Sequence, residues 1–194
     1  MIKFFKRFFM ASIAAMAFLS CDNDAMDTLA FVGDSEVARW DLPYYFPTRI
    51  VENHGRSGAG IDYIESLAGK FKDKTVVVVI GTNDLYKLID GGLDLYALRY
   101  VEAIKGLGAD RTFLYSIFPR NFASDMVDFN DIIRQLNKVV KTLVTEDVSI
   151  TYIPVFDDLY SSETKSINHQ YSYDGLHLND FGYELISNKL IQLL

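Results

Sequence analysis

Two polar segments of the chain carry residue types that could act together as a nucleophile, a base and an acid. Residues 33–35 (Gly-Asp-Ser) close a short apolar run, and residues 174–177 (Asp-Gly-Leu-His) lie near the carboxyl end. A serine hydroxyl is a poor nucleophile until a base takes its proton, which a histidine can do near neutral pH. A carboxylate on the other ring nitrogen fixes the tautomer and stabilises the imidazolium. Ser35, His177 and Asp174 are therefore candidates for these three roles.

Each segment, taken alone, also has a simpler interpretation. Asp and Ser are preferred at helix N-caps, so Asp34 and Ser35 could merely begin a helix. Asp174 and His177 can meet on one turn if Gly175 permits the bend, but such a pair could equally bind a metal or lie on the surface. The spacing leaves these alternatives open.

The other two histidines compete poorly for a role in chemistry. His54 lies in a glycine-rich segment and His169 in a polar one, and neither has a carboxylate at helical spacing. Three histidines without clustered acids or thiols do not predict a zinc site.

Two further residues could stabilise negative charge that develops during a reaction. Asn83 follows the apolar run 75–80, and its amide could donate to an oxyanion, a contact whose loss costs about 3–4 kcal/mol in a transition state. Gly58 could offer a backbone N–H at close range because it has no Cβ. Either residue could instead be an ordinary turn or loop residue.

The pattern of apolar residues predicts a single α/β domain over residues 28–194. The strands that we expect are 29–32, 49–52, 75–80, 112–118 and 149–155. We expect a first helix that begins at residue 36 and is limited by Pro43. Four further helices are expected over 61–71, 93–107, 126–145 and 179–194. Residues 53–60 are expected to be a loop and 157–173 to be irregular. Run 75–80 is apolar and β-branched after Thr75, which is typical of a central strand covered on both faces. This alternation predicts a parallel sheet with helices on both sides.

The first 27 residues have the pattern of a targeting sequence followed by a short tether. Basic residues precede a short apolar run that ends near residue 20, which is typical of a secretory signal and too short to span a bilayer. Residues 18–21 (Phe-Leu-Ser-Cys) resemble the lipobox of bacterial lipoproteins, which implies a lipid on Cys21 and a tether over 21–27. The alternative is an ordinary cleaved signal with an incidental cysteine.

Charge and cysteine content exclude several classes of protein. The net charge is −7 over 194 residues, and it becomes −10 without residues 1–20, which hold three basic residues and no acidic ones. Such a balance argues against nucleic acid as a partner and against adsorption to anionic membranes. The single cysteine excludes an intrachain disulfide.

Four segments, in this order, resemble the blocks of the SGNH hydrolases, also called GDSL esterases: residues 33–35, Gly58, residues 81–84 (Gly-Thr-Asn-Asp) and residues 174–177. The resemblance implies a three-layer α/β/α, flavodoxin-like domain with a central parallel sheet of about five strands. It implies Ser35 as nucleophile, His177 as base and Asp174 as its orienting acid. The backbone N–H groups of Ser35 and Gly58, with the Asn83 amide, would form the oxyanion hole. No metal or organic cofactor is implied.

Glu36 departs from the family pattern. The family often has an apolar residue at this position, so Glu36 puts an extra carboxylate beside the nucleophile, unless its side chain faces solvent.

The function expected from the whole sequence is that of an exported serine esterase in the bacterial cell envelope, anchored by lipid on the periplasmic side or at the cell surface. We expect it to remove small acyl groups such as acetyl from a carbohydrate. Lipid esters, including lysophospholipids, and thioesters are the alternatives within the family. A non-catalytic surface binding protein and a flavodoxin-like cofactor protein are the alternatives outside it. Five aromatic residues could line a cleft or belong to the core: Trp40, Phe118, Phe122, Tyr171 and Tyr173.

Overall fold

A computed structural model describes residues 28–194. The expected signal sequence, Cys21 and the tether lie outside this range. Among the described residues, no helix is both long enough and apolar enough to cross a membrane.

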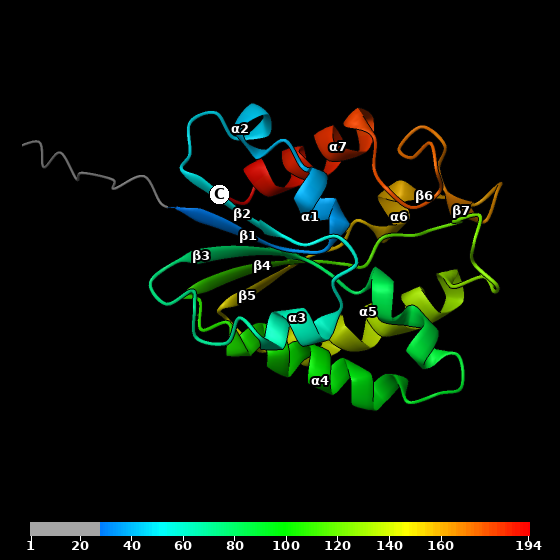
Figure 1. The fold of residues 1–194 in the computed structure, drawn as a ribbon, viewed down its shortest axis with the longest axis horizontal. Helices are drawn as coiled ribbons and strands as arrows, with labels where there is room; N and C mark the ends of the chain where they lie inside the picture. Colours follow the sequence, from blue (N-terminus) through cyan, green and yellow to red (C-terminus); the bar gives the residue numbers. More distant parts are fainter. Residues whose placement is uncertain (1–27) are drawn as a thin grey trace, which may run out of the picture.

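Five parallel strands form the central sheet, as the sequence predicts (Figure 1). They are β1 (Leu29–Gly33), β2 (Val51–Gly55), β3 (Thr75–Val79), β4 (Arg111–Tyr115) and β5 (Ile150–Ile153). Their spatial order is β2-β1-β3-β4-β5. This is the doubly wound order of the flavodoxin-like fold, in which ligands bind beyond the carboxyl ends of the strands. The predicted fold class is therefore confirmed.

Helices cover both faces of the sheet (Figure 1). One layer contains α1 (Ser35–Arg39), α2 (Leu42–Tyr45) and α7 (Asp180–Ile191). The other layer contains α3 (Ile61–Glu65), α4 (Leu93–Gly106) and α5 (Asn130–Val144). Because α1 directly follows β1 and α7 follows residues 174–177, both candidate catalytic segments lead into helices of the first layer.

The central strand shows how the sequence pattern produces this sandwich. Val76 and Val78 pack into the core cluster under α4 and α5, while Val77 and Val79 pack into the cluster under α1 and α7. All four side chains are buried. Burying one such side chain contributes about 1.5–3 kcal/mol relative to leaving it in water. An uninterrupted β-branched run is thus stable only where helices cover both faces of the strand.

Several element boundaries differ from those expected. Helix α5 begins at Asn130 rather than at 126, because the Asp128 carboxylate accepts a hydrogen bond from the Asn130 N–H (2.9 Å) and Met126 lies exposed. Helix α3 ends at Glu65 rather than at 71, and the chain continues in turns. Strand β2 extends through residues 53–55, which were expected to be loop.

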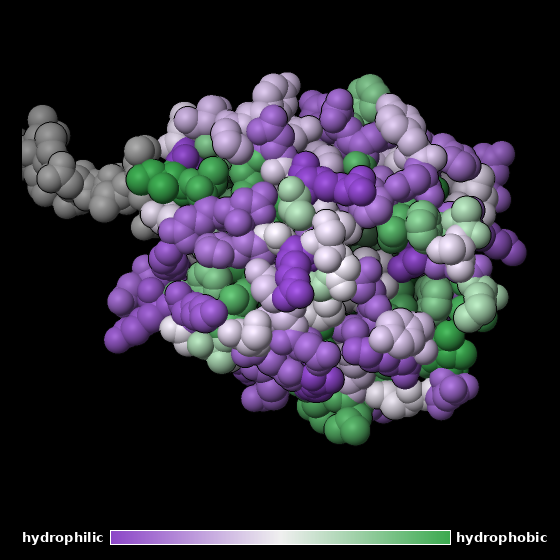
Figure 2. Space-filling view, viewed as in Figure 1, coloured by the Kyte–Doolittle hydropathy of each residue, from purple (hydrophilic) through white to green (hydrophobic). Residues whose placement is uncertain are grey.

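The segment expected to be irregular over 157–173 contains regular structure. Helix α6 (Phe156–Leu159) leads into a two-stranded antiparallel hairpin of β6 (Tyr160–Ser161) and β7 (Ser166–Ile167). After β3, the predicted turn is a 3₁₀ helix, η1 (Thr82–Leu88). Hydrophilic residues cover most of the face shown in Figure 2.

Candidate active site

Ser35 lies at the turn between β1 and α1, where it is the first residue of the helix. Asp34 is the N-cap, and its side chain accepts a hydrogen bond from the Glu36 N–H (2.9 Å). The capping interpretation therefore holds for Asp34, and the Ser35 hydroxyl is left for another partner. The Ser35 residue is only 6% exposed.

The structure brings Ser35, His177 and Asp174 together. Ser35 Oγ lies 3.1 Å from His177 Nε2, and His177 Nδ1 lies 2.7 Å from Asp174 Oδ2. A carboxylate accepts hydrogen bonds, so the tautomer that fits carries its proton on Nδ1 and leaves Nε2 free to accept from the Ser35 hydroxyl. Hydrogen bonds therefore run continuously from the hydroxyl to the acid, and they join Ser35 to His177, 142 positions away in the sequence.

A sharp turn at Gly175 lets the acid and the base meet. Gly175 has a φ of +78°, and a Cβ on this residue would lie 2.1 Å from the Asn121 carbonyl oxygen. The Asn121 N–H donates to the Gly175 carbonyl oxygen at 2.7 Å. Both the backbone angle and the close approach require glycine, which is the condition that the sequence analysis set for this pair.

The environment of Asp174 keeps its side chain ionised. Burial acts to raise its pKa, but three hydrogen bonds outweigh this and hold the pKa well below its ordinary value. The donors are the His177 ring and the backbone N–H groups of His177 (2.7 Å) and Leu176 (2.9 Å). An ionised carboxylate in this position can stabilise a protonated His177.

Gly58 and Asn83 follow the two strands that flank β1, so they lie with Ser35 at the same edge of the sheet. Gly58 is exposed and has a φ of +75°. The Asn83 amide donates one N–H to the Ala59 carbonyl oxygen at 2.9 Å. A side-chain amide has two N–H groups, so a second remains for a ligand. This arrangement can supply the donors that an oxyanion requires.

Asp84, to which the sequence analysis gave no role, holds the segment after Gly58 in place. Its buried carboxylate accepts hydrogen bonds from the Ile61 N–H (2.7 Å) and the Tyr96 hydroxyl (2.9 Å), and it pairs with Lys87 (2.7 Å). Neighbouring side chains, Asn83 and Asp84, thus contact the same short segment, 59–61. The signal in the sequence was a carboxylate directly beside the predicted oxyanion donor.

The sequence analysis gave no role to Arg120 either. Its guanidinium donates to the carbonyl and hydroxyl oxygens of Thr82 (3.0 Å each) and pairs with Asp125 (2.5 Å). The next residue, Asn121, bonds to Gly175 as described above. The segment after β4 therefore connects the turn that carries Asn83 to the turn that carries His177. A charged residue at the carboxyl end of a predicted strand was the available signal.

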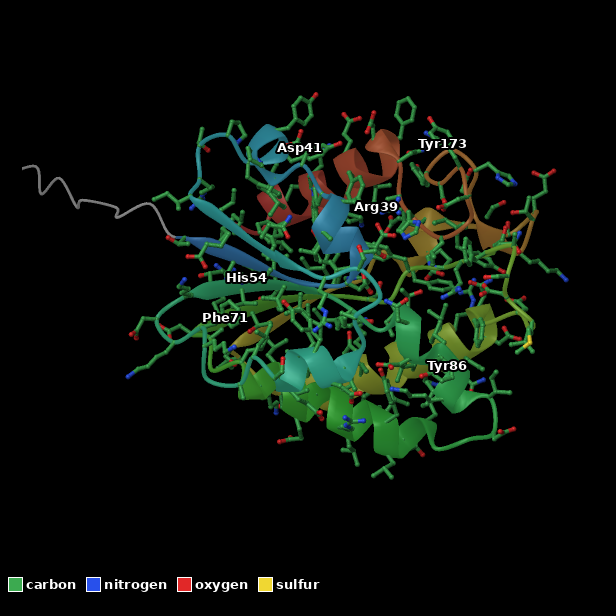
Figure 3. The ribbon with its side chains drawn as sticks, in the orientation of Figure 1. Arg39, Asp41, His54, Phe71, Tyr86 and Tyr173 are labelled. Carbon is green, nitrogen blue, oxygen red and sulfur yellow. The ribbon has the colours of Figure 1, made fainter. Side chains whose placement is uncertain are left out.

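The five aromatic residues do not form one wall. Trp40 and Phe118 are buried in the core. Tyr171 packs partly buried against the same cluster, and Phe122 lines a separate cavity after β4. Only Tyr173 is strongly exposed (82%), on the outer loop that leads into α7 (Figure 3).

The remaining histidines take no part in this site. His54 lies 3.1 Å from Glu52 and packs edge-on against Phe71, with ring centres 5.1 Å apart (Figure 3). Within residues 28–194, no group of three or more His, Cys, Asp or Glu side chains could hold a metal ion.

Comparison with known proteins agrees with the fold. The family model described as the GDSL-like lipase/acylhydrolase family matches residues 31–185. A comparison with curated proteins gave no match. Among solved structures, a Streptococcus pneumoniae protein described provisionally as a platelet activating factor is 25% identical, with a TM-score of 0.71 over 89% of this chain and 86% of that one.

Two further structures share the fold. A GDSL-like lipase from Bacteroides thetaiotaomicron is 20% identical, with a TM-score of 0.72 over 87% of each chain. The acetylxylan esterase Axe2 from Geobacillus stearothermophilus is 17% identical, with a TM-score of 0.60 over 86% of this chain and 93% of that one. The family match covers most of the residues that the structure describes. The chain therefore belongs to the GDSL-like lipase/acylhydrolase family and is a carboxylic ester hydrolase.

Proposed function

We propose that Ser35 is the nucleophile of this hydrolase, with His177 as its base and Asp174 as the orienting acid. The observation that carries the proposal is the continuous hydrogen bonding from Ser35 Oγ through the His177 ring to Asp174. Such an arrangement activates a hydroxyl that would otherwise be a poor nucleophile.

The reaction then follows from the geometry. Ser35 Oγ attacks the ester carbonyl carbon while His177 Nε2 takes the hydroxyl proton. The backbone N–H groups of Ser35 and Gly58 and the Asn83 amide donate to the oxyanion. His177 returns the proton to the leaving alcohol as the C–O bond breaks, which gives an acyl-enzyme. Water then attacks this ester, again with His177 as base, and releases the acid and Ser35.

The preferred substrate in this proposal carries a small acyl group, such as acetyl, on a carbohydrate. A cavity bordered by Glu36, Phe118 and Leu176 lies beside the catalytic segments, and its volume is about 10 Å³. In this proposal the acyl group enters this space, which both sequence neighbours of Ser35 border and in which about one water-sized group fits. The shared fold with an acetylxylan esterase is compatible with a sugar as the alcohol part.

We also propose that the enzyme acts outside the cytoplasm, in the cell envelope. The support is in the sequence: a signal-like pattern over residues 1–20, lipobox-like residues 18–21 that would place a lipid on Cys21, and polar residues over 21–27 that would tether the catalytic domain at 28–194. A lipid anchor would hold an acidic domain close to a membrane surface that its own charge does not favour.

Ser35→Ala tests the proposed nucleophile. We expect p-nitrophenyl acetate hydrolysis to fall by at least about 10³-fold, because the covalent step is lost, while the melting temperature stays within a few degrees. Equal activity in the variant would contradict the assignment.

A series of p-nitrophenyl esters from acetyl to decanoyl tests the acyl preference, and acetylated xylo-oligosaccharides test the alcohol part. We expect kcat/KM to be highest for acetyl and to fall as the chain lengthens. The opposite trend would favour a lipid esterase.

A further inference from the structure

Glu36, the residue after the nucleophile, is buried rather than facing solvent. It is only 3% exposed. Its Oε2 atom accepts hydrogen bonds from the Leu178 N–H (3.3 Å) and the Tyr183 hydroxyl (3.1 Å). The Tyr183 hydroxyl also lies 2.9 Å from the Glu36 carbonyl oxygen. Both the side chain and the backbone of Glu36 therefore contact the part of the chain that carries the base.

These contacts join the two halves of the Ser35–His177 pair. Glu36 directly follows Ser35, and Leu178 directly follows His177. The hydroxyl and the imidazole approach each other from segments 142 positions apart, so their distance depends on how these segments are held together. One carboxyl group, adjacent to both reacting residues, holds the two backbones at this point.

The surroundings of Glu36 favour its neutral form. Burial is the main cause that raises its pKa, to about 8, and the charge of Asp34 acts in the same direction. The Leu178 N–H, the Tyr183 hydroxyl and the charge of Arg39 act against this increase. These groups come from the turn after β1, from α1, from the segment just before α7 and from α7 itself. Hydrogen bonding, rather than an ion pair, is therefore what the side chain offers.

An apolar residue at this position would leave the Leu178 N–H without its acceptor. A buried donor without a partner costs about 1–3 kcal/mol, which a shift of the backbone could relieve. The same shift would change the position of His177. Displacements of about 1 Å in an active site can cost about 10²-fold in rate.

We propose that Glu36 is a positioning residue, whose carboxyl group ties the nucleophile's helix to the backbone beside the base and so sets the approach of Ser35 to His177. This inference rests on the proposed roles of Ser35 and His177. It concerns a residue at which the chain departs from the apolar type frequent in the family.

The test compares Glu36→Met and Glu36→Gln in the purified chain, with p-nitrophenyl acetate as substrate. Met has a similar length but only a weakly accepting sulfur, whereas the Gln carbonyl can accept from both donors. We expect Glu36→Met to lower kcat about 10–100-fold with KM within twofold, and Glu36→Gln to retain kcat within threefold. If the Met variant does not fold, Glu36→Asp provides the same test, because its side chain is too short to reach Leu178. We expect Glu36→Asp to lower kcat as strongly as Glu36→Met.

Ser187→Ala is the matched control. The Ser187 hydroxyl accepts from the Trp40 indole N–H at 3.0 Å, so this buried bond also joins α7 to the end of α1, but away from the base. We expect its melting temperature to fall by a few degrees with kcat within twofold of the wild type.

Two outcomes would overturn the inference: a folded Met or Asp variant that keeps kcat within twofold, or a Gln variant that loses as much as Met. Activity that persists in Ser35→Ala would instead overturn the proposed function, so the two failures can be told apart.

Discussion

Two groups of carboxylates beside the same nucleophile and base have opposite environments. The Asp174 side chain is 44% exposed and accepts hydrogen bonds from one ring N–H and two backbone N–H groups. Asp34 and Glu36, the two sequence neighbours of Ser35, are buried, and burial raises their pKa values to about 7 and about 8. Asp174, by contrast, has its pKa held below the ordinary value.

The difference shows that neighbouring carboxyl groups in one fold can have different roles, set by their environments. Donors and partial exposure favour the charged form of Asp174, which suits it to stabilise an imidazolium. Burial without a direct cationic partner favours the neutral forms of Asp34 and Glu36, which suits them to cap a helix and to hold a backbone. Residue type alone does not distinguish these roles.

The largest expected effects come from changes to the acid and the base, Asp174 and His177. Asp174→Asn should lower kcat by about 10³–10⁴-fold, because the amide no longer favours the required tautomer or stabilises the imidazolium. His177→Ala should lose more, since it removes the base itself. Steady-state kinetics of both variants on p-nitrophenyl acetate would measure this ranking, and the reverse order would contradict a purely orienting role for Asp174.

A smaller effect is expected at Asp84, which is buried like Glu36 but has a cationic partner. Burial acts to raise its pKa, yet Lys87 and the other donors bring it below the ordinary value. Asp84→Asn should lower kcat about 10-fold, through the segment after Gly58, and cost about 2 kcal/mol of stability. Thermal unfolding should show a melting temperature about 4–8 °C lower. An unchanged kcat would show that Asp84 has no influence on the oxyanion hole.

The smallest effect concerns the dependence of stability on pH. Asp34 and Glu36 have folded-state pKa values above their unfolded values, so between about pH 4.5 and 8 the folded state binds more protons than the unfolded state. Their contribution to stability is therefore lost as the pH rises through this window. We expect the melting temperature to fall by a few degrees from pH 5 to pH 8, and Glu36→Gln to reduce this slope. Parallel curves for the two proteins would argue against a neutral Glu36.

The sheet and most of the site could be predicted because their signals are local. A β-branched run such as 75–79 fits only a central strand, and the motif at 174–177 lies on one turn. The arrangement of Ser35, Gly58 and Asn83 follows from strand order, which the resemblance to a family supplied.

What escaped prediction depends on distant contacts. Glu36 is polar by type, and it is buried against Leu178 and Tyr183, which lie 142 and 147 positions away in the sequence. Arg120 is held by contacts with Thr82 and Asp125, and no pattern in the sequence predicts these contacts. The start of α5 coincides with a local turn in which the Asp128 carboxylate accepts from the Asn130 N–H, and the short hairpin of β6 and β7 has too few residues to show alternation.

Labelling of the purified chain with a fluorophosphonate, followed by peptide mass mapping, tests the central claim most directly. The reagent forms a covalent bond with an activated serine, so the account predicts one adduct, on Ser35, that is absent from Ser35→Ala and forms much more slowly in His177→Ala. A stoichiometric adduct on a different serine, or ester hydrolysis that persists while Ser35 stays unlabelled, would contradict it.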